Sequence, residues 1–189
     1  MLMLGDYSQA FMTHGPWIVF VFLFGACVGS FINVVNWRMP RGMSLSHPPS
    51  RCPICGGRLR FFRENLPILG WILLKGKCRY CRARIHPVYP ITEFAVALAF
   101  VGLYYCLFMS TPSQTWWWEV GGQWWVRQGF LLGWPAFFAV AFLFVGLYSI
   151  TVIDARTFMI PLAIPVFITC AAVVLWCVQA FIARTSGAS

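Results

Sequence analysis

Four long uncharged stretches alternate with polar segments along this chain. They run over Gly15–Trp37, Phe94–Met109, Gly129–Ile153 and Thr157–Ala183. Crossing the roughly 30 Å hydrocarbon layer of a bilayer takes about 20 residues of α-helix. Strands are excluded, because an isolated strand cannot satisfy its backbone polar groups in lipid. The pattern predicts four transmembrane helices, the second of which reaches full length only if it extends back through Ile91.

One apolar run is too short to cross a membrane. Leu66–Leu74 spans nine residues inside the polar segment between the first two stretches. We expect it to lie at the membrane interface or to pack on that segment. The predicted organisation has three parts: residues 1–37 hold an external N-terminus and the first helix, residues 38–90 form a loop, and residues 91–189 hold the other three helices.

Composition supports a membrane protein. Hydrophobic residues make up 60% of the 189 residues and charged residues 10%. Soluble globular domains are nearer 45–50% apolar and about 25% charged. There is too little polar surface to cover a particle in water. The predicted fold class is an all-α polytopic membrane protein with a small insert between its first two helices.

The positive charge is concentrated in one loop. Eleven of the 14 basic residues lie between Asn36 and Pro90 with one acid, Glu64, giving this segment a net charge of +10. Positively charged loops stay on the cytoplasmic side of a membrane. The chain is therefore expected to be a multi-pass protein of the bacterial inner membrane, with this loop cytoplasmic and both termini external. No basic residue precedes the first stretch, so we interpret it as an uncleaved anchor.

A basic loop also attracts anions. Contacts with phosphates would make binding to nucleic acid fall steeply with salt. The loop has no recognisable nucleic-acid recognition pattern, and membrane topology already accounts for its charge. We expect membrane lipid and no nucleic acid as its partner.

Tryptophans gather in the connection between the second and third stretches. This connection, residues 110–128, includes Trp116, Trp117 and Trp118. Indole rings favour the headgroup layer, which predicts an external aromatic belt. A protein-docking surface is the alternative.

Two Cys-x-x-Cys pairs lie in the basic loop, Cys52/Cys55 and Cys78/Cys81, separated by 22 residues. Two such knuckles can place four thiolates tetrahedrally around one zinc ion. A closed site of this kind is structural, because no ligand position stays open. Two disulfides are the alternative in an oxidising compartment, and iron in a rubredoxin-like site is another. The expected cytoplasmic location favours structural zinc.

Asp154 lies between the last two apolar stretches. An ionisable residue at membrane depth is a functional candidate, although an interfacial helix cap or a partner for Arg156 is an equal alternative. A protease built on carboxylates needs two, which share a proton and activate water. Glu93, at the mouth of the second span, could approach Asp154. Its alternative role is to anchor a helix start.

An ordered series of motifs resembles the type IV prepilin leader peptidase family. The series covers nearly all of residues 25–165. Its members are Gly29-Ser30-Phe31-Ile32-Asn33-Val34-Val35, Arg38-Met39-Pro40, Ser50-Arg51-Cys52-Pro53-Ile54-Cys55, Glu64-Asn65-Leu66-Pro67, Cys78-Arg79-Tyr80-Cys81, Tyr89-Pro90-Ile91-Thr92-Glu93, and Ile153-Asp154 before Ile160-Pro161.

The resemblance implies an intramembrane aspartic endopeptidase facing the cytoplasm. Such enzymes remove leader peptides from prepilins and pseudopilins of type IV pili and type II secretion systems. Many also N-methylate the product with S-adenosylmethionine. Asp154 matches the first catalytic aspartate, and the four cysteines match the zinc-binding set. Glu64, Asn65 and Glu93 are assigned to a substrate or methylation region, with a polar turn before an interfacial helix as the alternative for the first two.

The family's second catalytic aspartate lies in a later Gly-x-Gly-Asp motif. No such motif occurs before Ser189. Half of the dyad is therefore missing, and we expect little or no peptidase activity from these residues alone. The chain would be truncated, completed by a second chain that supplies the C-terminal half, or retained for methylation and docking. The alternative is a non-enzymatic, zinc-containing membrane module of a pilus or type II secretion assembly.

Overall fold

A computed structural model describes residues 3–47, 49–109 and 122–186 of the chain, and these residues form helices and no strand. The tryptophans 116–118 lie outside this description. The helices are α1 (Met3–Arg38), the 3-10 turn η1 (Met39–Arg41), α2 (Phe61–Glu64), α3 (Leu69–Leu73), α4 (Val88–Phe108), α5 (Gly122–Thr157) and α6 (Ala163–Thr185).

Four of these helices are long and apolar enough to cross a membrane, which confirms the predicted number of spans. The candidate spans are Met12–Arg41, Val88–Phe108, Gln128–Thr157 and Ala163–Thr185. The second span does extend back through Ile91, because α4 begins at Val88. Pro90 fits there because proline is tolerated in the first turn, where its missing N–H has no partner to lose.

The helix α5 is broken near its start. Gly129 has φ 66°, a left-handed conformation that separates two helical segments. The predicted span starts at the same residue, so the apolar part of α5 begins where the chain bends. A glycine is suited to this bend because it has no Cβ to clash in the left-handed region.

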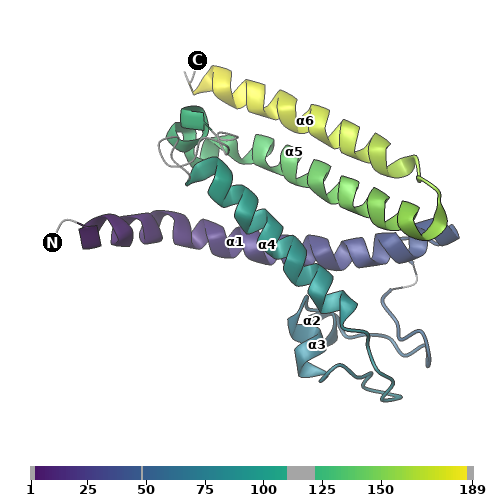
Figure 1. Ribbon diagram of the computed structural model, residues 1–189. Helices are drawn as coiled ribbons and strands as arrows, with labels where there is room; N and C mark the ends of the chain where they lie inside the picture. Colours follow the sequence, from purple (N-terminus) through teal and green to yellow (C-terminus); the bar gives the residue numbers. More distant parts are fainter. Residues whose placement is uncertain (1–2, 48, 110–121, 187–189) are drawn as a thin grey trace.

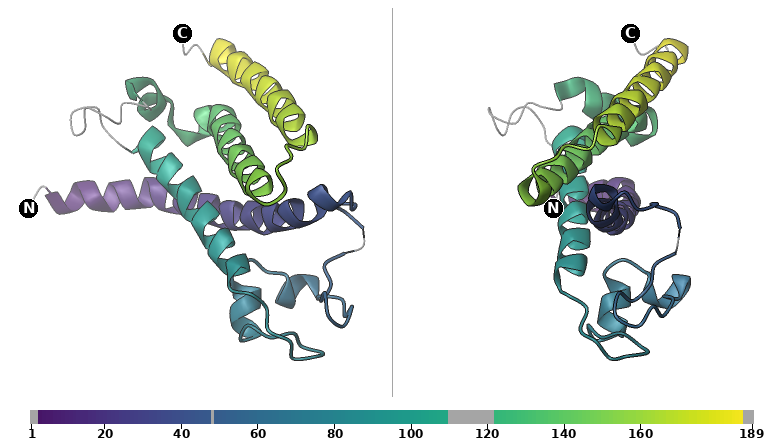
Figure 2. Two further views of the ribbon diagram at one scale, coloured as in Figure 1. Left: turned by 45° about the vertical axis from the view of Figure 1, so that its right-hand side comes forward. Right: turned by 90° about the vertical axis from the view of Figure 1, so that its right-hand side faces the viewer.

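An aromatic core joins α1, α4 and α5. Phe100, Tyr104 and Phe108 of α4 are buried against Phe130 and Phe137 of α5. Ring centroids in this cluster lie 5.2–6.4 Å apart, mostly in edge-to-face geometry, which favours the aromatic quadrupoles. The views in Figures 1 and 2 show α4 crossing α1 with α5 beside them.

The helices α1 and α4 approach closely at two glycines one turn apart. A Cβ on Gly25 would lie 2.9 Å from the Cα of Ala97, and one on Gly29 would lie 2.8 Å from the Cα of Glu93. Small residues four apart allow helix backbones to touch in a membrane. This contact fixes the start of α4, and with it the loop module, against the middle of α1.

A second cluster closes the bundle at the end where α1 finishes. Val35 of α1 and Ile153 of α5 are buried with Ile164 and Ile168 of α6, and Leu45 of the loop packs on them. In Figure 1 the turn between α5 and α6 accordingly lies beside the end of α1. The last turn of α5, which carries Asp154, is therefore at the same end of the bundle as the loop.

The loop forms a small module, residues 39–87, below α4 in Figure 1. Within it, Trp71 donates an indole hydrogen bond of 3.1 Å to the carbonyl of Ile85. The apolar run becomes α3, whose Leu69, Ile72 and Leu73 side chains are exposed. These exposed side chains suit an interface with lipid.

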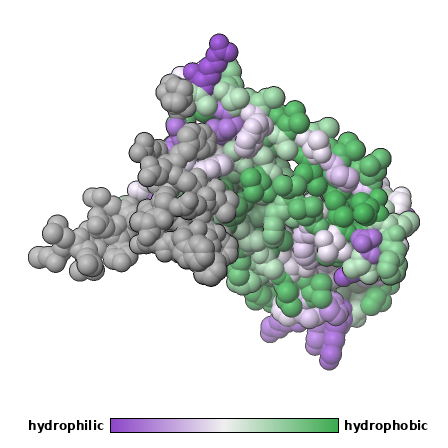
Figure 3. All heavy atoms as spheres, turned by 45° about the horizontal axis from the view of Figure 1, so that its top comes forward, coloured by the Kyte–Doolittle hydropathy of each residue, from purple (hydrophilic) through white to green (hydrophobic). Residues whose placement is uncertain are grey.

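Hydrophobic side chains dominate the surface of the helices. Figure 3 shows them spread over the visible face, with hydrophilic residues at its upper and lower edges. Of the four candidate spans, α6 is the least covered, with Phe167, Trp176 and Phe181 exposed. An apolar exterior of this kind matches a bilayer as solvent.

Candidate metal centre and catalytic carboxylate

The two cysteine pairs form two similar hairpins. In the first, the N–H of Gly56 donates to the carbonyl of Cys52 at 2.9 Å, and the backbones of Arg51 and Arg58 pair in an antiparallel β-bridge. In the second, the N–H of Arg82 donates to the carbonyl of Cys78 at 3.0 Å, and the backbones of Lys77 and Arg84 pair in the same way. Each tight turn therefore brings both of its sulfurs to one side of the hairpin.

The four sulfurs are arranged for one metal ion. The Sγ atoms of Cys52 and Cys81 are 3.8 Å apart, those of Cys55 and Cys78 are 3.9 Å apart, and all four lie within 4.8 Å of one another. A tetrahedron with Zn–S bonds of about 2.3 Å has S···S edges of about 3.8 Å. The residues fit a four-thiolate site, and all four cysteines are free thiols.

The surroundings of Cys52 and Cys81 shift the pKa values of these two thiols in opposite directions. The N–H groups of Cys55 and Ile54 point at the sulfur of Cys52 and lower its pKa to about 6. For Cys81 the N–H of Ala83 acts in the same direction, but desolvation and the neighbouring thiols outweigh it and raise the pKa to about 11. Four adjacent sulfurs cannot all become thiolates without a cation between them, as a structural zinc ion would be.

Glu64 links two parts of the module by a hydrogen bond and an ion pair. Its carboxylate accepts the N–H of Arg60 at 3.1 Å and pairs with the guanidinium of Arg79 at 3.1 Å. The Glu64 side chain is 4% exposed. Desolvation opposes ionisation, but the N–H of Arg60 and the charge of Arg79 outweigh it and hold the pKa of Glu64 below its usual range. This carboxylate connects α2 to the second hairpin.

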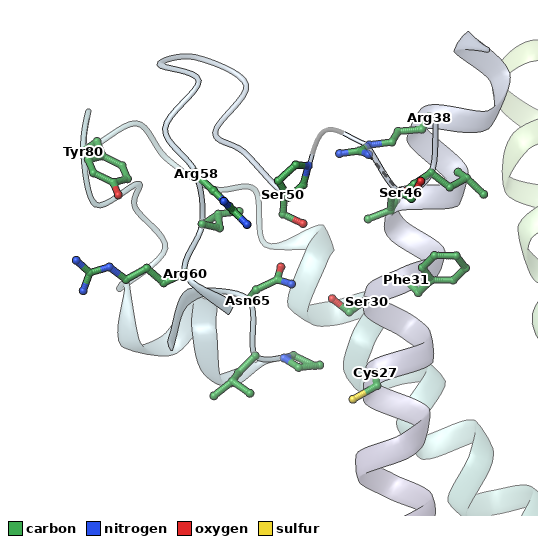
Figure 4. A pocket seen from close by; sticks show the side chains of 16 residues that line it. Cys27, Ser30, Phe31, Arg38, Ser46, Ser50, Arg58, Arg60, Asn65 and Tyr80 are labelled. Carbon is green, nitrogen blue, oxygen red and sulfur yellow. Dashed lines mark hydrogen bonds between the residues drawn. The ribbon is translucent and has the colours of Figure 1, made fainter. Parts of the chain in front are cut away.

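Asn65, its neighbour, lies differently. It lines a groove of about 910 Å³ between α1 and the module. Figure 4 shows Asn65 facing Ser30 of α1 across this space. The structure thus separates two residues that the motif placed together, because the chain turns at the end of α2.

Glu93 joins the module to the helices. It is 8% exposed, and its carboxylate accepts the N–H of Ile68 at 2.6 Å and a hydrogen bond from Ser30. Glu93 therefore anchors the start of a helix, but that helix is α3, whose N-cap residue is Ile68. Glu93 itself lies in the second turn of α4.

Asp154 is exposed near the end of α5. The N–H of Phe158 donates to its backbone carbonyl at 2.8 Å as the helix ends. Among the described residues, its carboxylate has no hydrogen bond or ion pair. The neighbouring Ile153 is 1% exposed, so packing fixes the turn and leaves the Asp154 carboxylate on the outer face.

Sequence reasoning missed the polar residues of α1. Ser30 contacts Glu93, and Asn33 donates to the carbonyl of Tyr89 at 3.2 Å. Both residues lie inside the first apolar stretch. Polar side chains within a span usually face protein or a cavity, and this signal could have identified them.

Comparison with known proteins gives consistent matches. Residues 23–107 match the family described as Bacterial Peptidase A24 N-terminal domain. A prepilin leader peptidase/N-methyltransferase of Myxococcus xanthus is 46% identical over 97 residues, which cover 47% of this chain and 29% of the relative. A type 4 prepilin-like proteins leader peptide-processing enzyme of Escherichia coli is 38% identical over 117 residues, covering 52% and 42%.

A longer match extends the likeness beyond the module. A prepilin leader peptidase/N-methyltransferase of Dickeya chrysanthemi is 30% identical over 169 residues, which cover 77% of this chain and 50% of the relative. The chain therefore spans half or less of the length of these curated relatives. No solved structure is significantly similar to it.

Proposed function

Because this chain belongs to the type IV prepilin peptidase family, we propose that it takes part in cleaving the leader peptides of prepilins or pseudopilins at a membrane. Its substrates would be those of type IV pili or type II secretion. In this proposal Asp154 is one carboxylate of an aspartic dyad. The module faces the cytoplasm, and the helices cross the bacterial inner membrane.

The observation that carries the proposal is the position of Asp154. Its carboxylate lies on the outer face of α5, at the end of the bundle that holds the module. A dyad needs a second carboxylate close enough to share a proton. Glu64 and Glu93 are engaged with Arg79 and Ile68, so neither serves this purpose. The second carboxylate would come from a further polypeptide segment that packs against the exposed face of α5.

The module would supply rigidity and not chemistry. Its four cysteines would hold zinc, which cross-links the two hairpins and offers no open ligand position. Glu93 then connects the module to α4 through Ile68, and Asn33 connects α1 to the start of α4 through the carbonyl of Tyr89. Together these contacts would hold the basic module beside the membrane where a substrate enters.

Methyl transfer is a separate activity in the relatives' names. S-adenosylmethionine carries a sulfonium cation, whereas the groove that Asn65 lines contains arginines and no acidic side chain. The groove residues do not fit this cofactor, and no methyl-transfer step is assigned to them. The proposal that this chain takes part in methylation is supported only by its membership of the family.

The test is complementation in membranes. The chain would be co-expressed with a prepilin and with a fragment that carries the Gly-x-Gly-Asp half expected from the family resemblance. Leader cleavage is expected in the combined membranes and is lost in Asp154→Asn, because the dyad then lacks its titratable partner. Thr151→Val, one turn away on α5, is the matched control and should cleave normally. Absence of cleavage in every combination contradicts the peptidase proposal.

The same experiment distinguishes the non-enzymatic alternative, which the unpaired carboxylate of Asp154 favours. A zinc-containing assembly module would support pilus formation or secretion as well in Asp154→Asn as in the wild type. It would fail in Cys78→Ser, because the hairpins would separate. Loss of function in Asp154→Asn contradicts that alternative.

A further inference from the structure

The groove between α1 and the module has two different ends. Its volume is about 910 Å³. At one end it is lined by Arg38, the last residue of α1, and by Arg58 and Arg60 of the module, and Figure 4 shows Arg38 and Arg58 projecting toward one another from opposite walls. No acidic side chain lines it. This end therefore attracts an anion.

The other end is apolar and lies along α1. Its wall is formed by Cys27, Phe31 and Val34, which share one helix face at spacings of four and three residues. Phe31 is 54% exposed, so neither α4 nor α5 covers this face. From Arg38 to Cys27 the helix rises about 16 Å, which takes the groove from the membrane surface well into the hydrocarbon layer.

The two arginines have different supports. One guanidinium nitrogen of Arg38 donates to the carbonyls of Ser44 and Leu45, at 3.0 and 3.4 Å, and is thereby fixed over the mouth of the groove. Arg58 is exposed, and its guanidinium has no hydrogen bond or ion pair within the described part of the chain. A phosphate between them would therefore find one positioned cation and one adaptable cation.

We propose that this groove binds an anionic phospholipid from the leaflet beside the module. The phosphodiester lies between Arg38 and Arg58, and one acyl chain follows the Phe31 face of α1. A soluble anion would use the arginines but leave the apolar wall exposed. A basic leader peptide would meet like charges. The inference is independent of the proposed peptidase activity.

Lipid retention by the purified full chain tests the proposal. The protein is incubated in mild detergent with equal amounts of phosphatidylglycerol and phosphatidylcholine of the same acyl chains, and bound lipid is counted by native mass spectrometry. Preferential retention of phosphatidylglycerol is expected. Arg58→Gln should lower it about fivefold, because one interfacial cation is lost. Cys27→Trp should lower it by filling the apolar end.

Each variant has a matched control. Arg84 occupies the position of Arg58 in the second hairpin but does not line the groove, so Arg84→Gln should retain lipid. Leu23, an exposed residue of α1 one turn beyond Cys27, is outside the lining, so Leu23→Trp should also retain it. Thermal unfolding of all four variants confirms that they fold. Arg58→Gln alone decides the matter if Cys27→Trp does not fold, because Arg58 is exposed.

The outcomes separate the possible ligands. A lipid site keeps its phosphatidylglycerol when glycerol 3-phosphate is added in excess, because the acyl chain contributes to binding. Displacement by glycerol 3-phosphate would show a site for soluble phosphates and overturn the proposal. Equal retention by the wild type, Arg58→Gln and Cys27→Trp would overturn it as well.

Discussion

At the scale of single residues, the two cysteine hairpins differ at one corresponding position. Gly56 has φ 68° and Arg82 has φ 60°. A side chain in the left-handed region costs roughly 1 kcal/mol, which glycine avoids. The second hairpin therefore contains a strain that the first does not.

Replacing Arg82 with glycine should relieve this strain. We expect Arg82→Gly to stabilise the metal-loaded module by about 0.5–1 kcal/mol, measured by thermal unfolding in detergent. Gly56→Ala, the converse change in the first hairpin, should destabilise it by a similar amount. Equal unfolding temperatures for the wild type and both variants would show that the turns carry no strain.

The cysteine sulfurs decide whether the module holds a metal. The wild type should contain about one zinc ion per chain. Cys78→Ser should lose it, because three ligands leave the tetrahedron open, and protease should then cut the module. Cys170→Ser, an exposed thiol on α6, is the control and should keep its zinc. Elemental analysis with limited proteolysis measures both effects, and full zinc content in Cys78→Ser would contradict the site.

The Glu64–Arg79 pair predicts a dependence on pH. The pKa of Glu64 is lowered in the folded module, so the stabilisation is complete above its unfolded pKa of about 4 and is lost as the pH falls through the lower folded value. Glu64→Gln removes this contribution. Because the zinc ligands also protonate in acid, the measured quantity is the difference in unfolding temperature between the wild type and Glu64→Gln. That difference should be constant at neutral pH and shrink below about pH 4. A difference that grew in acid would exclude the ion pair as its source.

At the scale of elements, the contact of α1 with α4 matters most for the site. The backbone of Glu93 packs against Gly29, and its carboxylate accepts a hydrogen bond from Ile68 of the module. Close packing of these two helices therefore sets the position of the module, and the zinc ion would set only its internal shape.

Gly29→Ala tests this contact. A Cβ there would lie 2.8 Å from the Cα of Glu93, a backbone atom that cannot move alone. We expect a loss of about 1–3 kcal/mol in stability from overpacking, measured by unfolding in detergent. Gly102→Ala is the matched control on α4, because a Cβ there meets nothing within 4 Å, and it should be neutral or stabilising. Equal effects of the two substitutions would argue against a close approach.

At the scale of the whole molecule, the fold places Asp154 and the module at one end of the bundle. Leu45 of the module packs in the same cluster as Ile153. The excess of basic residues in the module then predicts on which side of the membrane this end lies.

Tag accessibility checks this orientation. An epitope inserted after Met43, in the module, should be protected in intact cells whose outer membrane has been permeabilised. An epitope fused after Ser189 should be accessible in the same cells. Both tags should become accessible once the inner membrane is opened. A module tag accessible from outside would overturn the orientation and remove the reason to expect reduced thiols.

Much of the architecture followed from the sequence alone. Hydrophobic length determined the four spans, because only helices satisfy their backbone in lipid, and each Cys-x-x-Cys spacing determined a turn that carries two sulfurs, because such a turn is local. The break at Gly129 also coincided with the predicted start of a span. These features depend on neighbours along the chain, so a linear pattern contains them.

Contacts between distant segments were decided only by the tertiary structure. Glu64 and Asn65 are adjacent in sequence, yet one braces the hairpins and the other lines a groove. Glu93 holds the start of α3 because the glycines of α1 let α4 approach it. The groove combines arginines with one face of α1. The sequence pattern does not predict which faces of a helix stay uncovered by other helices. Such placements depend on how helices pack, a property of pairs of segments and not of either one.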